Sequence, residues 1–383
     1  MPSFRQLTFM VLYTSTGIVV GLPSLWLLFN AQTAVGLLLA TFGLLSLLLP
    51  LLFVIPQRKQ NRFLRRAPEA VVFLLVVVGT AVFLQIPSGD PGPDSPVQHR
   101  FVGDEAYGRF SLSNLVPESE QVNLGFTLMP YVDPLLTVEQ SRRVSPITMD
   151  IYREMEQDPN FRELGSALGL AYAELWGRPF DAGHYYLYVP PNAGPEPLPT
   201  IVFLHGSAGN FKAYTWLWSK LAEAEGYVII APSYGFGNWD ETSAAAVLQV
   251  IEDARQVVNI DTEHLYLAGL SNGGLGVSHL ANLAPEQFRG LIFLSPVMAT
   301  EVVDSASFQA AWANRPVLVI SGEIDNRIPL SYVEQRIAVM QQANIDVTPI
   351  IYPNEDHFLV FSQPEAIMND VAEWLASVEE YDP

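Results

Sequence analysis

Cysteine is absent from this sequence of 383 residues, and charged residues are scarce. Without cysteine the chain has no disulfide, no thiolate ligand for a metal or an iron–sulfur cluster, and no cysteine nucleophile. Only 16% of the residues are charged and 49% are hydrophobic, which is a high apolar content for a chain that is soluble throughout. The net charge of −20 argues against nucleic acid as a partner.

The basic residues are unevenly distributed along the chain. Residues 1–86 hold six basic residues and one acidic residue, a net charge of +5, whereas residues 87–383 hold 14 basic and 39 acidic residues, a net charge of −25. At about 150 residues per domain, the length allows two or three domains. The contrast in charge predicts that two chemically different parts are joined near residue 87.

Three long apolar runs without a charged residue lie in the first part, at residues 7–29, 33–55 and 70–86. A bilayer core about 30 Å thick requires about 20 helical residues, with a range of about 17–25. We therefore predict a membrane anchor of three transmembrane helices over residues 1–86, with membrane lipid as its partner and a kink at Pro23. Two spans and one interfacial segment are the alternative. A cleavable signal peptide has one shorter apolar run.

The orientation of this anchor follows from its basic residues. The connection over residues 56–68 holds five of them: Arg58, Lys59, Arg62, Arg65 and Arg66. Connections rich in lysine and arginine stay in the cytoplasm. The third helix then leads outward, so we expect a protein integral to the cytoplasmic membrane whose remaining residues lie on the extracytoplasmic side.

Two segments separate the anchor from the last 200 residues. Residues 87–98 are rich in proline and glycine, which predicts an extended linker. Residues 99–178 form a partly helical preface with mixed patterning. Its clearest element is a helix expected over residues 151–176, with Asp158 as the N-cap and Pro159 in the first turn. This preface either covers an edge of the following sheet or forms a lid over the active site.

Short apolar runs alternate with helical patterns over residues 179–383. Continuous apolar strands separated by helices predict an α/β fold, in which a mostly parallel sheet carries helices on both faces. Catalytic groups in such a fold lie on loops at the carboxyl ends of the strands. We expect strands at residues 184–189, 200–204, 227–231, 264–270, 290–295, 316–321 and 347–352.

The sharpest motif is GLSNG at residues 269–273, which follows a predicted strand and opens a predicted helix. A sharp strand–turn–helix connection exposes the serine hydroxyl, and the flanking glycines relieve side-chain collisions. The amides at the start of the helix favour developing negative charge. We therefore predict Ser271 as a nucleophile; the alternative is a tight turn with an idle serine.

A serine hydroxyl requires a base, and the chain offers six histidines. His357 lies just past the last predicted strand and is the expected base. His184 and His264 stand at strand starts, which we take as the wrong end of the sheet. His205 ends a strand but belongs to a glycine-rich turn.

The acid that orients the base is expected at the end of the strand at residues 316–321. Asp325 is the predicted residue there, and Glu323 is its rival. Asp356 is adjacent to His357 and is expected to point elsewhere. The order Ser271, Asp325, His357 along the chain is the order of an α/β-hydrolase triad.

An oxyanion hole requires two backbone N–H groups. We expect one from Asn272, directly after the nucleophile. The other is expected from Ser207 in the HGSAG turn at residues 205–209, with Ala208 as the alternative.

Together, HGSAG at residues 205–209, GLSNGG at 269–274, GEIDNRIP at 322–329 and EDH at 355–357 resemble the α/β-hydrolase superfamily of serine hydrolases. The elbow region at residues 261–274 is similar to that of polyhydroxybutyrate depolymerase-like, feruloyl-esterase-like and dienelactone-hydrolase-like esterases. The resemblance implies an α/β-hydrolase domain over residues 179–383 that hydrolyses a carboxylic ester through an acyl-serine intermediate.

The sequence therefore predicts a membrane-anchored, extracytoplasmic serine esterase that acts on a small-molecule or lipid-like ester. No cofactor and no metal are expected, since the histidines lack a ligand spacing such as HExxH. A serine peptidase or amidase on the same fold and a catalytically idle binding module are the alternatives.

Overall fold

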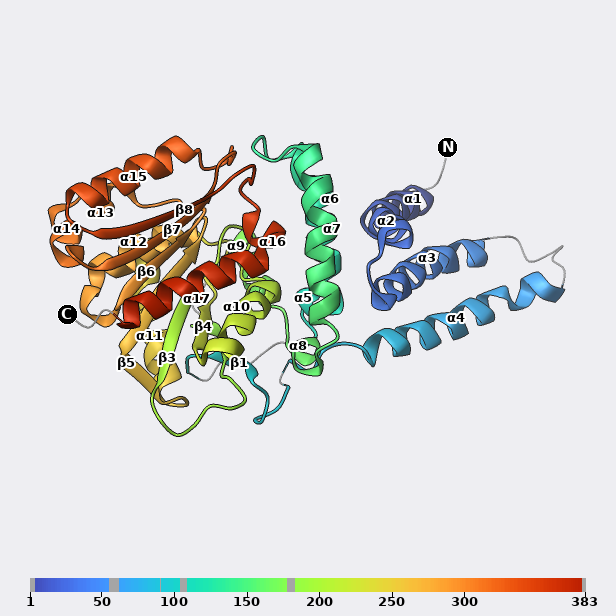
Figure 1. The fold of residues 1–383 in the computed structure, drawn as a ribbon. Coiled ribbons are helices and arrows are strands. Elements are labelled where there is room, and N and C mark those ends of the chain that lie inside the picture. The colour runs from blue at the N-terminus through green and yellow to red at the C-terminus, as the bar shows by residue number, and fades with distance from the viewer. Residues whose placement is uncertain (1–3, 55–61, 90, 104–108, 178–182, 381–383) are drawn as a thin grey trace. The chain divides into compact units, whose positions relative to one another are not determined.

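The computed structural model describes residues 4–54, 62–89, 91–103, 109–177 and 183–380 (Figure 1). These residues form two compact units. The first, the anchor unit, comprises Met1–Ile86 and Phe110–Gly125. The second, the catalytic unit, comprises Pro87–Arg109 and Phe126–Pro383.

Long apolar helices make up most of the anchor unit. Within the part of the chain that the structure describes, three helical stretches are long and apolar enough to cross a membrane, as the sequence predicts, at Met10–Asn30, Ala34–Leu52 and Arg66–Phe83. A π-helical turn ends at Gly21, two residues before Pro23, whose missing N–H cannot serve the regular helical ladder. The elements are α1 (Phe4–Thr16), the π-helix η1 (Gly17–Gly21), α2 (Leu22–Asn30), α3 (Ala34–Val54) and α4 (Arg62–Phe83).

The third helix differs in its limits from the predicted run at residues 70–86. It begins at Arg62, inside the predicted basic connection, because arginine is a good helix former, and it ends at Phe83. Residues 84–86 form a turn before Pro87, since a residue that precedes proline is disfavoured in a helix. Residue 55 of the second predicted run lies outside the described residues, as do Arg58 and Lys59.

Residues 110–125 pack against the turn between α2 and α3. This segment holds α5 (Leu112–Leu115) and the start of α6 (Glu118–Leu128). Glu120 Oε1 accepts hydrogen bonds from the N–H of Gln32, the N–H of Thr33 and the Thr33 hydroxyl, each at 2.8 Å. A Cβ at Gly36 would lie 2.3 Å from the same oxygen, so the first turn of α3 has room for the carboxylate only because Gly36 has no side chain.

An eight-stranded sheet forms the centre of the catalytic unit, in the order β1-β2-β4-β3-β5-β6-β7-β8 (Figure 1). β2 pairs antiparallel with both β1 and β4. The strands β4, β3, β5, β6, β7 and β8 are parallel to one another, which confirms the predicted α/β fold. The strands are β1 (Val97–Phe101), β2 (His184–Tyr188), β3 (Leu198–Leu204), β4 (Val228–Pro232), β5 (Ile260–Leu270), β6 (Gly290–Leu294), β7 (Pro316–Gly322) and β8 (Asp346–Tyr352). β1 was not expected; its first residues, Val97 and Gln98, come from the predicted linker.

Helices cover both faces of this sheet, because successive residues of each strand point to opposite sides. On one face, Phe203 of β3 packs against Trp218 of α10 (Lys212–Glu225), beside α17 (Pro364–Glu380). On the other face, Val202 and Leu204 share a core with further helices. These are α11 (Glu241–Arg255), α12 (Gly273–Leu283), α13 (Thr300–Val303), α14 (Ala306–Trp312) and α15 (Leu330–Gln342).

The preface is helical, but the single helix expected over residues 151–176 is wrong. Three helices stand there instead: α7 (Val138–Met155), α8 (Pro159–Glu163) and α9 (Leu168–Leu175). Asp158 caps α8 as predicted, since its Oδ1 accepts the N–H of Asn160 at 2.7 Å. The hydroxyl of Tyr186 on β2 donates to Gly165 O and accepts from Ala167 N–H, so it takes backbone groups that a continuous helix would use.

The remaining short elements lie at turns. They are the 3-10 helices η3 (Met129–Tyr131) and η4 (Pro285–Gln287), and the helix α16 (Leu359–Ser362). α16 follows directly after the loop that carries His357, at the carboxyl end of β8.

Candidate active site

Ser271 stands in the turn between β5 and α12, in a conformation that few residues adopt. Its φ of 52° is left-handed, and a non-glycine residue there stores backbone strain. A Cβ at Gly269 would lie 2.5 Å from Gly273 O, and a Cβ at Gly273 would lie 2.1 Å from Leu204 O. Both glycines are therefore required by the turn that presents the serine at the carboxyl end of the sheet.

His357 connects Ser271 to Asp325. Its Nε2 lies 3.0 Å from Ser271 Oγ, and its Nδ1 lies 2.8 Å from Asp325 Oδ2. An ionised carboxylate only accepts hydrogen bonds, so Nδ1 carries the proton and Nε2 has a lone pair for the serine hydroxyl. The structure thus brings together the three residues that the sequence proposes as a triad.

Asp325 is held in place by backbone groups of its own loop. Its side chain is fully buried, and Oδ1 accepts the N–H groups of Arg327 and Ile328, both at 2.8 Å. Glu323, its rival, instead accepts the N–H of Asn354 at 3.0 Å. The second carboxylate oxygen of Asp325 is therefore directed to His357.

The HGSAG turn passes close to the serine. A Cβ at Gly206 would lie 3.3 Å from Ser271 Cβ. The N–H of Ala208 donates to Phe236 O at 3.1 Å, which removes Ala208 as an oxyanion donor. Among the described residues, the N–H groups of Ser207 and Asn272 donate to no protein acceptor, as a pair of oxyanion donors requires.

His205, at the start of this turn, is a structural group. It is buried, its Nδ1–H donates to Gly206 O at 2.7 Å, and its Nε2 accepts the N–H of Tyr234 at 3.0 Å. Burial lowers the pKa of His205 to about 4, although the Gly206 carbonyl opposes this shift. The ring is therefore neutral at pH 7, which the acceptor role of Nε2 requires.

The placement of His184 at the wrong end of the sheet is incorrect. Because β2 runs antiparallel to β4, the start of β2 lies beside the carboxyl end of β4. His184 Nδ1 bonds to Ser233 Oγ at 2.7 Å and makes no contact with Ser271. Burial, followed by the charges of His99 and His205, holds the pKa of His184 well below its ordinary value.

The preface contributes charged and polar groups that sequence reasoning missed. Arg143 on α7 pairs with Asp356 Oδ2 at 2.6 Å, so Asp356 points away from His357, as expected. Gln140 Nε2 donates to the same Asp356 oxygen and to Asn326 Oδ1, each at 3.1 Å. Gln140 also forms a capping box with Thr137, and the spacing of these two residues was the available signal that a helix starts here.

Asp133, just before α7, lies close to the histidine. It bonds to Arg327 Nη1 at 2.7 Å, and its side chain is mostly buried. Burial alone would raise the pKa of Asp133, but the N–H of Leu135, the Arg327 guanidinium and the charge of protonated His357 together lower it. Asp133 is therefore a carboxylate at pH 7.

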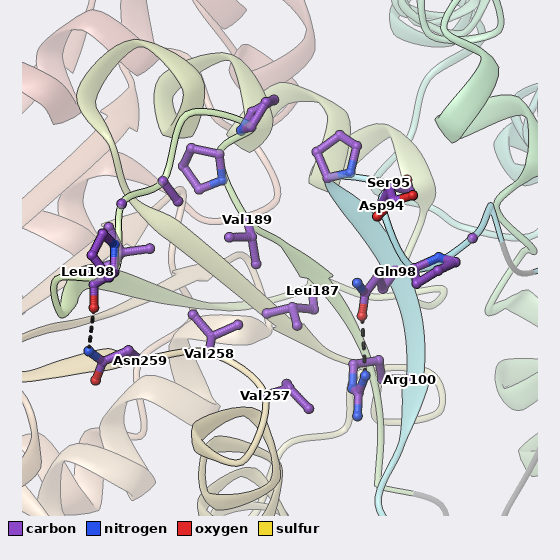
Figure 2. A pocket seen from close by; sticks show the side chains of 18 of the residues that line it. Asp94, Ser95, Gln98, Arg100, Leu187, Val189, Leu198, Val257, Val258 and Asn259 are labelled. Atoms are coloured by element: carbon purple, nitrogen blue, oxygen red, sulfur yellow. Dashed lines mark hydrogen bonds between the residues drawn. The ribbon is translucent and has the colours of Figure 1, made fainter.

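Among the hollows that the described residues of the catalytic unit form, two differ in their distance from the proposed triad in sequence and fold. A mostly apolar cavity of about 440 Å³ lies beside the elbow and the acid loop, lined by residues that include Leu275, Val297, Met298, Arg327, Ile328 and Tyr332. Figure 2 shows a larger one, about 830 Å³, lined by Gln98, Arg100, Leu198 and Asn259 among others. The larger hollow lies at the amino ends of β3 and β5, and none of the predicted site residues lines it.

Comparison with known proteins agrees with this geometry. Residues 195–349 match a family described as serine aminopeptidase, S33. A bifunctional acetylxylan esterase/xylanase of Neocallimastix patriciarum is 29% identical over 154 residues, 38% of this chain and 22% of that protein. Dipeptidyl-peptidase 5 of Porphyromonas gingivalis is 23% identical over 247 residues, 51% of this chain and 36% of that protein. The chain thus spans between about a fifth and a little over a third of the length of these relatives.

Solved structures are similar to about half of the chain. A thermostable esterase matches with a TM-score of 0.45 and 19% identity, covering 52% of this chain and 60% of the esterase. Est1E from Butyrivibrio proteoclasticus matches with a TM-score of 0.43 and 19% identity, covering 52% of this chain and 95% of Est1E. The fold, the family match over residues 195–349 and the relatives together support a serine hydrolase with the α/β-hydrolase fold.

Proposed function

We propose that this protein is a membrane-anchored serine hydrolase that cleaves a carboxylic ester through an acyl-serine intermediate. The observation that carries the proposal is the continuous hydrogen-bonded series from Ser271 Oγ to His357 Nε2, at 3.0 Å, and from His357 Nδ1 to Asp325 Oδ2, at 2.8 Å. A hydroxyl beside a basic nitrogen that is itself oriented by a buried carboxylate is an activated nucleophile.

In the first half of the reaction, Ser271 Oγ attacks the ester carbonyl carbon while its proton moves to His357 Nε2. The carbonyl oxygen becomes an oxyanion, which the N–H groups of Ser207 and Asn272 stabilise. Asp325 stabilises the imidazolium that forms. His357 then gives the proton to the leaving alcohol oxygen as the bond to that oxygen breaks, which leaves an acyl-serine.

In the second half, a water molecule attacks the acyl-serine carbonyl. His357 Nε2 takes one proton from this water, and the same two N–H groups stabilise the second oxyanion. Collapse of this intermediate releases the carboxylic acid and returns the proton to Ser271 Oγ.

The hollow lined by Leu275, Val297 and Ile328 supports a substrate class, although none of the proposed site residues lines it. A mostly apolar cavity of about 440 Å³ is within the usual size of small-molecule sites and favours an apolar group on one side of the ester. We therefore propose a small-molecule or lipid-like ester. The acetylxylan esterase among the relatives supports an ester bond as the target.

Amide hydrolysis is the second candidate, because two relatives bear the names dipeptidyl-peptidase 5 and acylamino-acid-releasing enzyme. The same triad serves both reactions, so the test compares matched substrates. We expect the purified full chain to accelerate the hydrolysis of short acyl p-nitrophenyl esters over the uncatalysed rate by a larger factor than that of the corresponding p-nitroanilides. The opposite order would favour the amidase.

Replacing the nucleophile tests the chemistry itself. Ser271→Ala is expected to abolish labelling by a fluorophosphonate probe and to lower ester turnover by at least about 10⁴-fold. Ser307→Ala on α14 changes an exposed serine and serves as the matched control. Labelling that persists in Ser271→Ala would refute the assigned nucleophile.

We also propose that the catalytic unit lies on the extracytoplasmic side. The three apolar helices support anchoring, and the basic residues at positions 58–66 support a cytoplasmic connection between the second and third helices. Protease added to intact spheroplasts should then digest the catalytic unit. A catalytic unit protected until lysis would contradict this orientation.

A further inference from the structure

The turn that presents the Ser207 N–H is supported by a neighbouring loop, residues 234–239. Ala208 adopts a left-handed φ of 80°, and its N–H donates to Phe236 O at 3.1 Å. The Trp239 indole N–H donates to His205 O at 2.9 Å. The loop at residues 234–239 therefore fixes the turn before and after Ser207.

The two backbones are in close contact. Gly237 has a φ of 83°, and a Cβ there would lie 2.5 Å from Gly206 O. The N–H of Tyr234 donates to His205 Nε2 at 3.0 Å. With no side chain between them, a displacement of the loop at residues 234–239 displaces the turn as well.

Glu174 on α9 holds the opposite side of this loop. Its Oε2 accepts the N–H of Phe236 at 2.6 Å, and its Oε1 accepts a hydrogen of the Asn238 amide at 3.1 Å. A Cβ at Gly235 would lie 1.8 Å from Glu174 Oε2, so glycine at this position leaves room for the carboxylate. Hydrogen bonds to an ionised acceptor are stronger than neutral ones.

We propose that Glu174 is a positioning residue for the oxyanion hole. The Phe236 residue transmits its effect, since the N–H of Phe236 donates to Glu174 and the carbonyl of Phe236 accepts from Ala208. α9 lies outside residues 195–349, so this support comes from the preface and not from the matched region. The inference rests on the proposed function.

The expected signature is a loss in kcat with little change in KM. The oxyanion exists only in the transition state and the tetrahedral intermediate, so a displaced N–H weakens transition-state binding more than substrate binding. Removing an oxyanion donor outright costs about 10²–10³-fold in kcat. A displaced donor should cost less, about 10- to 50-fold.

Glu174→Ala in the full chain tests this inference. We expect a kcat on p-nitrophenyl esters that is 10- to 50-fold lower and a KM within about threefold of the native value. The affinity for a trifluoromethyl ketone inhibitor, which forms a tetrahedral oxyanion, should fall by the same factor as kcat. Glu163→Ala is the matched control, because Glu163 is also a preface carboxylate that accepts a backbone N–H, that of Ser88 at 3.1 Å. It should leave kcat unchanged.

Two further variants separate positioning from general damage. Glu174→Gln should retain most of the kcat that Glu174→Ala loses. The carbonyl oxygen of the glutamine can accept the N–H of Phe236, and its amide can donate to the Asn238 oxygen once the Asn238 amide group flips by 180°. Asn238→Ala, which removes one of the two bonds at an exposed residue, should lower kcat about two- to fivefold and answers the question if Glu174→Ala does not fold.

The inference is overturned if folded Glu174→Ala matches Glu163→Ala, or if its loss appears in KM with the ketone affinity unchanged. Unchanged kcat in Asn238→Ala together with a Glu174→Ala chain that does not fold would also overturn it. Failure of the proposed function has a different signature, because Ser271→Ala would then retain ester hydrolysis.

Discussion

Within the catalytic unit, the groups proposed to react come from loops at the ends of β5, β7 and β8, whereas several groups that hold those loops come from the preface. The sheet loops use buried backbone and side-chain bonds, as at Asp325. The preface uses partly exposed charges, as at Arg143 and Glu174. The difference suggests that the sheet sets which chemistry is possible, while the preface sets how accurately the loops are held.

The largest effect on kcat is expected from a residue in a loop at the end of the sheet. Asp325→Asn should lower kcat by about 10⁴-fold, since an amide can stabilise the wrong tautomer of His357 and cannot stabilise the imidazolium. Glu323→Gln is the control in the same loop and should change kcat less than about threefold. Steady-state kinetics on a p-nitrophenyl ester decides the assignment, and a larger loss in Glu323→Gln would reverse it.

The second prediction concerns the stability of the folded chain at acidic pH. The folded state keeps His205 neutral, with a pKa of about 4 against an ordinary value of 6.5, so the unfolded chain binds more protons between these values. The contribution of His205 to the free energy of unfolding is therefore fully present above pH 6.5. It is lost as the pH falls toward 4, and the loss from this residue is about 3 kcal/mol. Urea unfolding of the native chain and of His205→Asn at pH 7.5 and pH 4.5 checks this. The variant should lose less stability on acidification; an equal loss would point to other groups.

The smallest effect is expected from a single preface contact. Arg143→Ala leaves Asp356 almost fully buried without its cation, and Gln140 remains as a donor, so the free energy of unfolding should fall by about 1–2 kcal/mol. Since Arg143 contacts no proposed reacting group, kcat should fall less than about fivefold. Arg142→Ala, its sequence neighbour, is the control. A loss of kcat as large as that of Asp325→Asn would erase the distinction between sheet and preface.

Much of the sheet side could be predicted from sequence because its signals are local. The glycines around Ser271 are required by a turn a few residues long, and apolar runs of five to seven residues identify buried strands. The placement of His184 failed for a reason of topology: residue pattern does not indicate whether a first strand runs parallel or antiparallel to its neighbour. Strand β1 was not predicted because the proline and glycine residues just before Val97 suggested a linker.

The preface side could not be predicted in the same way. Arg143 and Asp356 are 213 positions apart, and Glu174 contacts a loop about 60 residues further on. Nothing in the local pattern of α7 or α9 indicates these partners. The continuous helix expected over residues 151–176 failed likewise, because a hydroxyl from β2 competes for the backbone groups at residues 165 and 167.

The path of the chain between the two units has a consequence for proteolytic release. The chain leaves the anchor unit after Ile86, returns to it for Phe110–Gly125, and leaves again. A single cut within residues 87–96 would leave the fragment that begins after the cut still attached, because Glu120 and Asn123 hold the turn between α2 and α3 without a peptide bond. Shedding of an active catalytic unit therefore requires that this segment detach, and the turn at residues 30–33 acts as a second tether.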